Sequence, residues 1–168
     1  PERQKLIWDT RIGASDFLLE KLQESGRKLK AFVSASALGY YSFADNKIAL
    51  DEDSQMGTAF EAVLSEGWEK AADRFKTAGI AQRVVKLRVS LVLGNEGGIF
   101  PVFKNMLKSQ PEAFRSIEGY TYFPWVHVRD MAGMFAYGVT NNNLDGVFNT
   151  TAPGLATKEG IFRKMYYL

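Results

Sequence analysis

Two short runs of apolar residues, 30–36 and 84–93, flank one long segment that has the periodicity of an amphipathic helix. The first run predicts a buried strand. The second run is rich in Val and Leu, which predicts a strand buried on much of both faces, as in parallel sheets. Between the runs, apolar residues recur at the spacing of one helix face: Phe60, Leu64, Trp68, Ala71 and Phe75. This order of strand, helix and strand is typical of an α/β fold with a mainly parallel sheet.

Local signals mark the limits of the predicted central helix. Thr58 and Glu61 have the spacing of a capping box, which predicts the start of the helix. Glu66 and Lys70 stand four residues apart on the opposite side, which predicts a stabilising ion pair. Gly79 stands where the helix is expected to end.

The rest of the chain continues the alternation of helices and strands. The sequence predicts a helix over residues 3–25, a loop over 37–57, a helical stretch near 101–108, a short strand over 125–128, a helix capped by Asp130 and a last strand over 146–149. We found no linker rich in Pro, Gly or Ser, so residues 1–168 are predicted to form one domain with helices flanking the sheet.

Composition excludes several classes of function. The chain has no Cys and a single His, which excludes disulfide scaffolds, Cys-ligated zinc, thiolate catalysis and sites with two histidines, so no metal site is predicted. The formal net charge of +2 is too small to predict a nucleic-acid partner. No apolar stretch is long enough for a membrane span. The absence of Cys favours an intracellular location without indicating a compartment.

Hydroxyl groups gather where the first predicted strand ends. Ser34 and Ser36 close that strand, and Tyr40 and Tyr41 follow directly. Open α/β sheets bind ligands outside the carboxyl ends of their strands, and a Ser beside a Tyr can polarise a carbonyl or hydroxyl group. The alternative is a tight turn built from small residues, with both tyrosines half-buried.

Two later segments are weaker candidates. Gly94, Gly97 and Gly98 lie between a predicted strand and a predicted helix, where glycine exposes backbone N–H groups to a phosphate. The spacing is neither that of a P-loop nor G-x-G-x-x-G, so a loop that turns close to a ligand is the preferred interpretation. His127 is the only imidazole and could shuttle protons, although a structural histidine is the more common case.

Five motifs, taken in order, resemble one family. They are Ser34-Ala35-Ser36-Ala37-Leu38-Gly39-Tyr40-Tyr41; Trp68-Glu69; Leu87-Arg88-Val89-Ser90-Leu91-Val92-Leu93-Gly94 with Gly97-Gly98; Phe123-Pro124-Trp125-Val126-His127-Val128-Arg129-Asp130; and Gly146-Val147-Phe148-Asn149 with Ala152-Pro153. In this order they resemble the atypical extended short-chain dehydrogenases/reductases of the NAD-dependent epimerase-like group, the SDR39U type. The resemblance covers essentially the whole chain.

The resemblance implies a Rossmann-like fold, NAD(P) as cofactor and a small substrate bearing a hydroxyl or carbonyl group. It implies a catalytic role for Ser36, which would orient the substrate oxygen. If the protein is an enzyme, Tyr40 or Tyr41 is expected to substitute as the catalytic proton donor. The resemblance implies cofactor contacts for Ser34, Arg88 and Gly94. It implies substrate contacts for Gly97, Gly98, Trp125 and His127.

The chain departs from the family pattern in three places. The chain starts at Pro1 and contains no G-x-G-x-x-G motif, so it is expected to hold the central and later part of an incomplete doubly wound fold. Whether this chain alone binds NAD(P) is therefore left open. Phe60 and Leu64 occupy the positions of the Tyr-x-x-x-Lys pair that extended members use for acid/base work. Residues 115–120 replace an expected glycine-rich stretch.

These departures leave two main hypotheses. The first is an NAD(P)-linked oxidoreductase or epimerase-like enzyme. The second is a non-catalytic structural or assembly subunit of a larger complex. In that case a protein partner or a further chain segment would cover the sheet, because exposed sheet edges invite association. A third, weaker hypothesis is a module that binds a phosphate-bearing ligand at residues 94–98.

Overall fold

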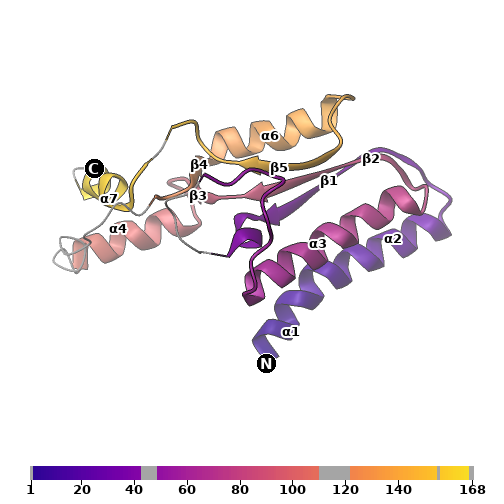
Figure 1. Ribbon diagram of the computed structural model, residues 1–168, viewed down its shortest axis with the longest axis horizontal. Coiled ribbons are helices and arrows are strands. Elements are labelled where there is room, and N and C mark those ends of the chain that lie inside the picture. The colour runs from indigo at the N-terminus through magenta and orange to yellow at the C-terminus, as the bar shows by residue number, and fades with distance from the viewer. Residues whose placement is uncertain (1, 43–48, 110–121, 155, 167–168) are drawn as a thin grey trace. The chain divides into compact units, whose positions relative to one another are not determined.

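The computed structural model describes residues 2–42, 49–109, 122–154 and 156–166, which form alternating helices and strands (Figure 1). Residues 115–120, which stand where the family pattern has a glycine-rich stretch, lie outside the described residues. In chain order the elements are α1 (Glu2–Trp8), a π-helical turn η1 (Asp9–Gly13), α2 (Ala14–Glu24), β1 (Leu29–Ala37), a 3₁₀ turn η2 (Leu38–Tyr41), α3 (Phe60–Thr77), β2 (Ala81–Val89), β3 (Leu91–Leu93), α4 (Ile99–Ser109), β4 (Trp125–His127), α6 (Val128–Thr140), β5 (Gly146–Thr150) and α7 (Lys158–Tyr166).

The chain divides into two compact units, each of which is described by itself. The first unit comprises Pro1–Ala44, Leu50–Arg88 and Phe135–Asn149. The second comprises Asp45–Ala49, Val89–Met134 and Thr150–Leu168.

A three-stranded sheet in the order β1-β2-β5 forms the centre of the first unit. The three strands run parallel, so their carboxyl ends meet at one edge (Figure 1). Helices α2 and α3 lie on one face of the sheet and the second half of α6 lies on the other (Figure 1). On the first face the ring of Phe75 in α3 stacks on Phe32 in β1, with 3.7 Å between the centroids. On the second face a Cβ atom on Gly138 of α6 would stand 3.2 Å from Val33, so glycine allows this helix to approach the sheet closely.

Helix α3 forms as predicted, but its start differs from the prediction. Gly79 has a φ of +64° directly after the helix, as a glycine at this position allows, and Lys70 pairs with Glu66 at 2.7 Å. The predicted capping box is wrong. The cap is Ala59, one residue after Thr58, and the first helical N–H groups are bonded to the Ala59 carbonyl oxygen rather than to a side chain.

Three other boundaries differ from the sequence prediction. The predicted strand over residues 84–93 is two strands, because the chain leaves the first sheet at Ser90 and β3 joins a second sheet. Helix α6 starts at Val128, so Asp130 lies in its first turn and does not cap it; its charge still favours the helix N-terminus there. The predicted helix over 3–25 contains the π-helical turn Asp9–Gly13.

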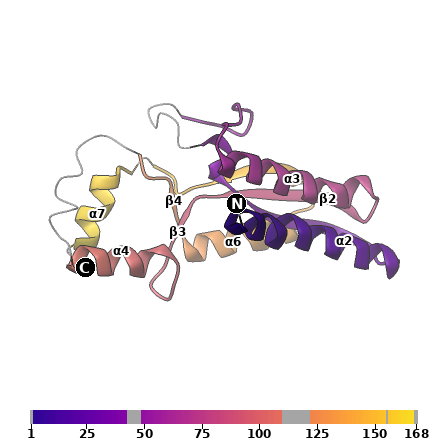
Figure 2. The same cartoon turned by 90° about the horizontal axis from the view of Figure 1, so that it is seen from below.

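The second unit is built around the short parallel pair of β3 and β4, in which Leu91 lies opposite Trp125. Helices α4 and α7 pack together beside this pair (Figure 2). The rings of Phe103, Phe123 and Phe162 form the centre of the core here, with Phe103 edge-on to Phe162 at a centroid distance of 5.2 Å. Helix α7 has no counterpart among the sequence predictions.

A buried arginine ties β2 to the end of α6. The guanidinium of Arg83, which is 7% exposed, donates to the carbonyl oxygens of Gly138 (2.6 Å), Val139 (2.7 Å) and Leu144 (3.2 Å). The last carbonyl groups of a helix have no partner within the helix, and a cation at this end is also favoured by the helix dipole. Arg83 therefore holds the C-terminal end of α6 against strand β2.

Replacing Arg83 with Met is expected to lower the free energy of unfolding by about 3 kcal/mol, because the buried carbonyl groups lose their charged donor. Urea denaturation measures the loss. Arg129→Gln on the exposed first turn of the same helix is the control and should change stability by less than about 0.5 kcal/mol. Equal effects of the two substitutions would contradict the capping role of Arg83.

Candidate functional site

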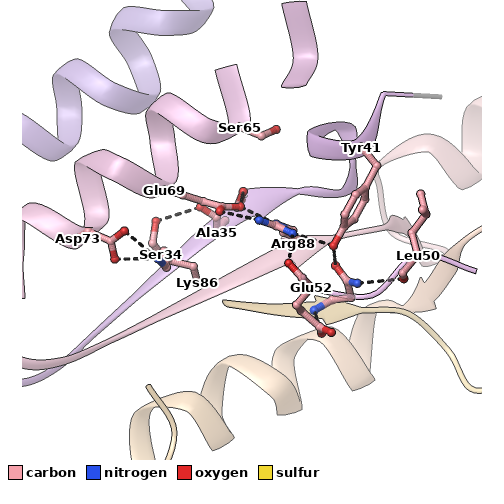
Figure 3. A network of polar contacts seen from close by, with 12 residues as sticks. Ser34, Ala35, Tyr41, Leu50, Glu52, Ser65, Glu69, Asp73, Lys86 and Arg88 are labelled. Atoms are coloured by element: carbon pink, nitrogen blue, oxygen red, sulfur yellow. Dashed lines mark hydrogen bonds and ion pairs between the residues drawn. The ribbon is translucent and has the colours of Figure 1, made fainter. Parts of the chain in front are cut away.

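Polar side chains from all three strands meet at the carboxyl edge of the first sheet (Figure 3). Ser36, Arg88 and Asn149 are each the last residue but one of their strand, in β1, β2 and β5 respectively. Because the strands are parallel neighbours, equivalent positions near their ends lie side by side. The sequence thus brings a hydroxyl, a guanidinium and an amide to one edge.

The central interaction at this edge is a buried ion pair between Arg88 and Glu69 of α3. Arg88 Nε donates to Glu69 Oε1 at 2.8 Å and Nη2 donates to Oε2 at 3.0 Å, so the contact is bidentate. The side chains are 3% and 9% exposed, respectively. Ser36, which is also buried, donates to Glu69 Oε1 at 2.7 Å. The carboxylate therefore joins helix α3 to both β1 and β2.

Tyr41 extends the network to the third strand. Its hydroxyl oxygen accepts a bond from Arg88 Nη1 at 2.7 Å. The same hydroxyl lies 2.8 Å from the Asp51 carbonyl oxygen and 2.8 Å from Asn149 Oδ1, so its single proton is shared between two acceptors. Asn149 Nδ2 donates to the Leu50 carbonyl oxygen at 3.4 Å, which fixes which end of the amide faces Tyr41.

Tyr41, Arg88 and Asn149 also form hydrogen bonds with residues 50–52, which lie across the sheet edge. The Glu52 carboxylate accepts a bond from the backbone N–H of Asn149 at 2.6 Å. The Glu52 carbonyl oxygen accepts a bond from Arg88 Nη1 at 3.3 Å. With the Leu50 carbonyl bonded to Asn149 and the Asp51 carbonyl bonded to Tyr41, three consecutive residues of this segment are held by side chains of β5, η2 and β2.

Burial and bonding keep the network in one charge state. Burial alone would lower the pKa of the Arg88 guanidinium, but the bonds to Glu69 and Tyr41 outweigh it and the pKa is raised. Burial also raises the pKa of the Tyr41 phenol, despite the opposing bonds from Arg88 and Asn149. Arg88 therefore stays charged and Tyr41 stays neutral near neutral pH. Both behave as fixed parts of a scaffold rather than as groups that exchange protons.

Tyr40 has a different environment from its neighbour. The guanidinium carbon of Arg88 lies 3.4 Å from the centroid of the Tyr40 ring, and the Tyr41 ring meets Tyr40 edge-on at 5.3 Å. A desolvated cation–π contact of this kind is worth about 2 kcal/mol. Tyr40 is only half-buried, whereas Tyr41 is 6% exposed. The contacts therefore fix the ring of Tyr40 and leave its hydroxyl without a bond among the described residues.

The first unit thus brings together five of the predicted site residues. Ser36, Tyr40, Tyr41 and Arg88 are in one network, while buried Ser34 on the same strand donates to the Ala35 carbonyl oxygen at 2.9 Å. The catalytic and cofactor-binding roles given to them by resemblance stay predictions.

The other predicted site residues lie in the second unit. Gly94 faces Val128, whose Cγ1 would stand 2.8 Å from an added Cβ, so close packing accounts for this glycine. Gly98 has a φ of +72° and turns the chain into α4, and Gly97 faces open space. Trp125 packs partly buried against the aromatic core. His127 is exposed.

The imidazole of His127 is oriented by its own backbone. Its Nδ1 accepts a bond from the Arg129 backbone N–H at 3.2 Å, so in the neutral ring Nε2 carries the proton. The cofactor and substrate contacts predicted for residues of this unit stay predictions.

Three residues of this polar network were not among the predicted site residues: Glu69, Glu52 and Asn149. The signal for Glu69 was present, because it falls on the same side of α3 as the buried Ala62 and Ala72. A carboxylate at a buried helical position needs a buried cation as partner. Glu52 and Asn149 meet only through the fold, and no local pattern indicates their contact.

The start of α3 carries no acid/base pair. Phe60 and Leu64 stand at the positions expected for Tyr-x-x-x-Lys, and neither side chain can exchange a proton. Within the described ranges no group of three or more acidic or His side chains is arranged to hold a metal ion. Nor does any helix in those ranges have the length and apolar character needed to cross a membrane.

No family model matches the chain. The epimerase family protein ML0860 of Mycobacterium leprae (strain TN) is 30% identical over 149 residues, which are 89% of this chain and 47% of that protein. The crystal structure of human epimerase family protein SDR39U1 (isoform 2) with NADPH is 26% identical, has a TM-score of 0.73, and matches 95% of this chain and 53% of that one. The nucleoside-diphosphate sugar epimerase from Corynebacterium glutamicum is 24% identical, has a TM-score of 0.84, and matches 98% of this chain and 35% of that one.

These findings confirm two predictions. The resemblance to epimerase-like proteins of the SDR39U type is confirmed by relatives of about 30% identity over most of the chain. The Rossmann-like α/β fold is confirmed by the solved structures. The chain spans about half the length of the curated relatives it matches.

The ion pair at the centre of the site is testable by a double-mutant cycle. Glu69→Gln is expected to lower the free energy of unfolding by about 3–5 kcal/mol, because Arg88 keeps a buried charge without its counter-ion. The double variant E69L/R88M should lose less than the sum of E69L and R88M. Urea denaturation measures all the variants.

Glu66→Gln on the same helix is the matched control, since the Glu66–Lys70 pair is exposed and its loss should cost less than about 1 kcal/mol. Additive effects of E69L and R88M would contradict a coupled buried pair.

Proposed function

We propose that this chain is part of an NAD(P)-linked, epimerase-like short-chain dehydrogenase/reductase and that it holds a small substrate bearing a hydroxyl or carbonyl group. The observation that carries the proposal is the meeting of Ser36, Arg88 and Asn149 at the carboxyl edge of three parallel strands. Ligands of open α/β sheets bind outside this edge. The names of the relatives support the reaction class, and one structural neighbour was solved with NADPH.

The described residues do not themselves form a cradle for the dinucleotide. Such a cradle needs a glycine-rich turn of G-x-G-x-x-G spacing between a strand and a helix, and the chain has none. In the turn before α4, Gly94 is accounted for by its packing on Val128, and Gly97 is not crowded by any neighbour. We therefore assign the NAD(P) cradle to another part of the whole protein and derive no step through the nicotinamide.

One observation favours the alternative of a non-catalytic subunit. The start of α3 carries Phe60 and Leu64 where acid/base residues are expected. The hydroxyl proton of Tyr41 is already hydrogen-bonded to Asp51 and Asn149. An active protein of this kind must therefore draw its substrate-binding hydroxyl from elsewhere on the same edge. The two hypotheses differ in whether the protein consumes NADPH.

The test uses the complete gene product. It is expected to bind NADPH saturably, seen as quenching of tryptophan fluorescence, and to consume NADPH in the presence of glyceraldehyde or dihydroxyacetone as carbonyl probes. The exposed variant Arg129→Gln should behave as the unmodified protein. A flat NADPH titration together with no consumption for any probe would overturn the proposal and favour the structural subunit.

A further inference from the structure

Strand β1 and the turn η2 that follows it carry four side-chain hydroxyls, and three of them form hydrogen bonds with described residues. Ser34 donates to the Ala35 carbonyl oxygen and Ser36 donates to the Glu69 carboxylate. Both serines are buried, at 7% and 2% exposure. A substrate that used either proton would have to break a bond inside the first unit. The serines are therefore poor candidates for the group that contacts a substrate.

Tyr41 is excluded by the same reasoning. Its hydroxyl already accepts from Arg88 and shares its proton between Asp51 and Asn149. A phenol has one proton, so this set of partners leaves none with which Tyr41 could donate to a substrate. Moving the proton to a substrate would also leave two part-buried acceptors without their donor, which is costly.

Tyr40 is the remaining hydroxyl, and its position is fixed by contacts to its ring. Arg88 stacks on one face of the ring at 3.4 Å, and Tyr41 meets it edge-on at 5.3 Å. Arg88 is itself held by both carboxylate oxygens of Glu69. Among the described residues no group bonds to the Tyr40 hydroxyl, and the side chain is half-buried rather than enclosed.

We infer that Tyr40 presents the hydroxyl that donates a hydrogen bond to the substrate oxygen, and that Arg88 positions it. The inference rests on the proposed function and deepens it, because it assigns the substrate contact to one of the three predicted catalytic residues. A phenol O–H directed at a carbonyl oxygen withdraws electron density from the carbon, and directed at a hydroxyl it orients that group. Ser36 and Tyr41 are positioning residues that keep Arg88 and the turn in place.

The experiment compares Tyr40→Phe with two other Tyr→Phe substitutions in the complete protein. Y40F removes a hydroxyl to which no described residue bonds, so its urea midpoint should be unchanged while kcat/KM for NADPH consumption falls about 100-fold or more. Tyr137→Phe, on the exposed face of α6, should change neither quantity. Y41F should lower the urea midpoint, because it breaks the buried network.

A second readout does not depend on turnover. Tetranitromethane followed by peptide mass mapping should nitrate Tyr40 and spare Tyr41 in the folded protein, because Tyr40 is half-buried whereas Tyr41 is 6% exposed. Modification of Tyr41 with protection of Tyr40 would overturn the inference. Y40F with full turnover would also overturn it, while leaving the proposed function intact. A complete protein with a flat NADPH titration and no NADPH consumption for any probe would overturn both.

Discussion

The burial of Arg88 against Glu69 is the interaction on which the carboxyl edge of the sheet depends. Taking two charges out of water costs several kcal/mol for each ion, and the cost is offset only when the geometry is good and the remaining donors and acceptors are bonded. Both conditions hold, since the contact is bidentate and the remaining Arg88 nitrogen reaches Tyr41 and the Glu52 carbonyl oxygen. The neighbouring Ser36 and Tyr41 must therefore keep their positions, because each forms a hydrogen bond with one member of the buried pair.

This scaffold also limits which groups remain for chemistry. The edge holds several hydroxyls, but satisfying the buried charges occupies Ser36 and Tyr41. Tyr40 contributes only its ring to the scaffold, by stacking on Arg88. Extended short-chain dehydrogenases/reductases use a Tyr-x-x-x-Lys pair, in which a Lys on one helix supports the Tyr of that helix that donates a proton. In this chain the cation is Arg88 of β2, and its guanidinium lies against the ring of Tyr40. A tyrosine and a cation are again neighbours, but they come from different elements.

The sequence predicts what is periodic or local. The apolar runs predict β1 and β2, the apolar stripe predicts α3, and Gly79 predicts where that helix ends. The break at Ser90 was missed because the residues on both sides of it are equally apolar, and only the second sheet distinguishes them.

The candidate site was predicted in part for the same reason. Ser36, Tyr40 and Tyr41 follow one strand in the sequence, so their proximity is a local property. Their division of roles is decided by Glu69, Arg88 and Asn149, which are 33 to 113 residues away from Ser36 and meet it through the fold.

The most direct test of this account is hydrogen exchange at the Arg88 side chain, measured by ¹⁵N NMR. The account predicts an Arg88 Nε–H that exchanges far more slowly than that of the exposed Arg129. Exchange at the same rate in both would contradict a buried ion pair at the centre of the site.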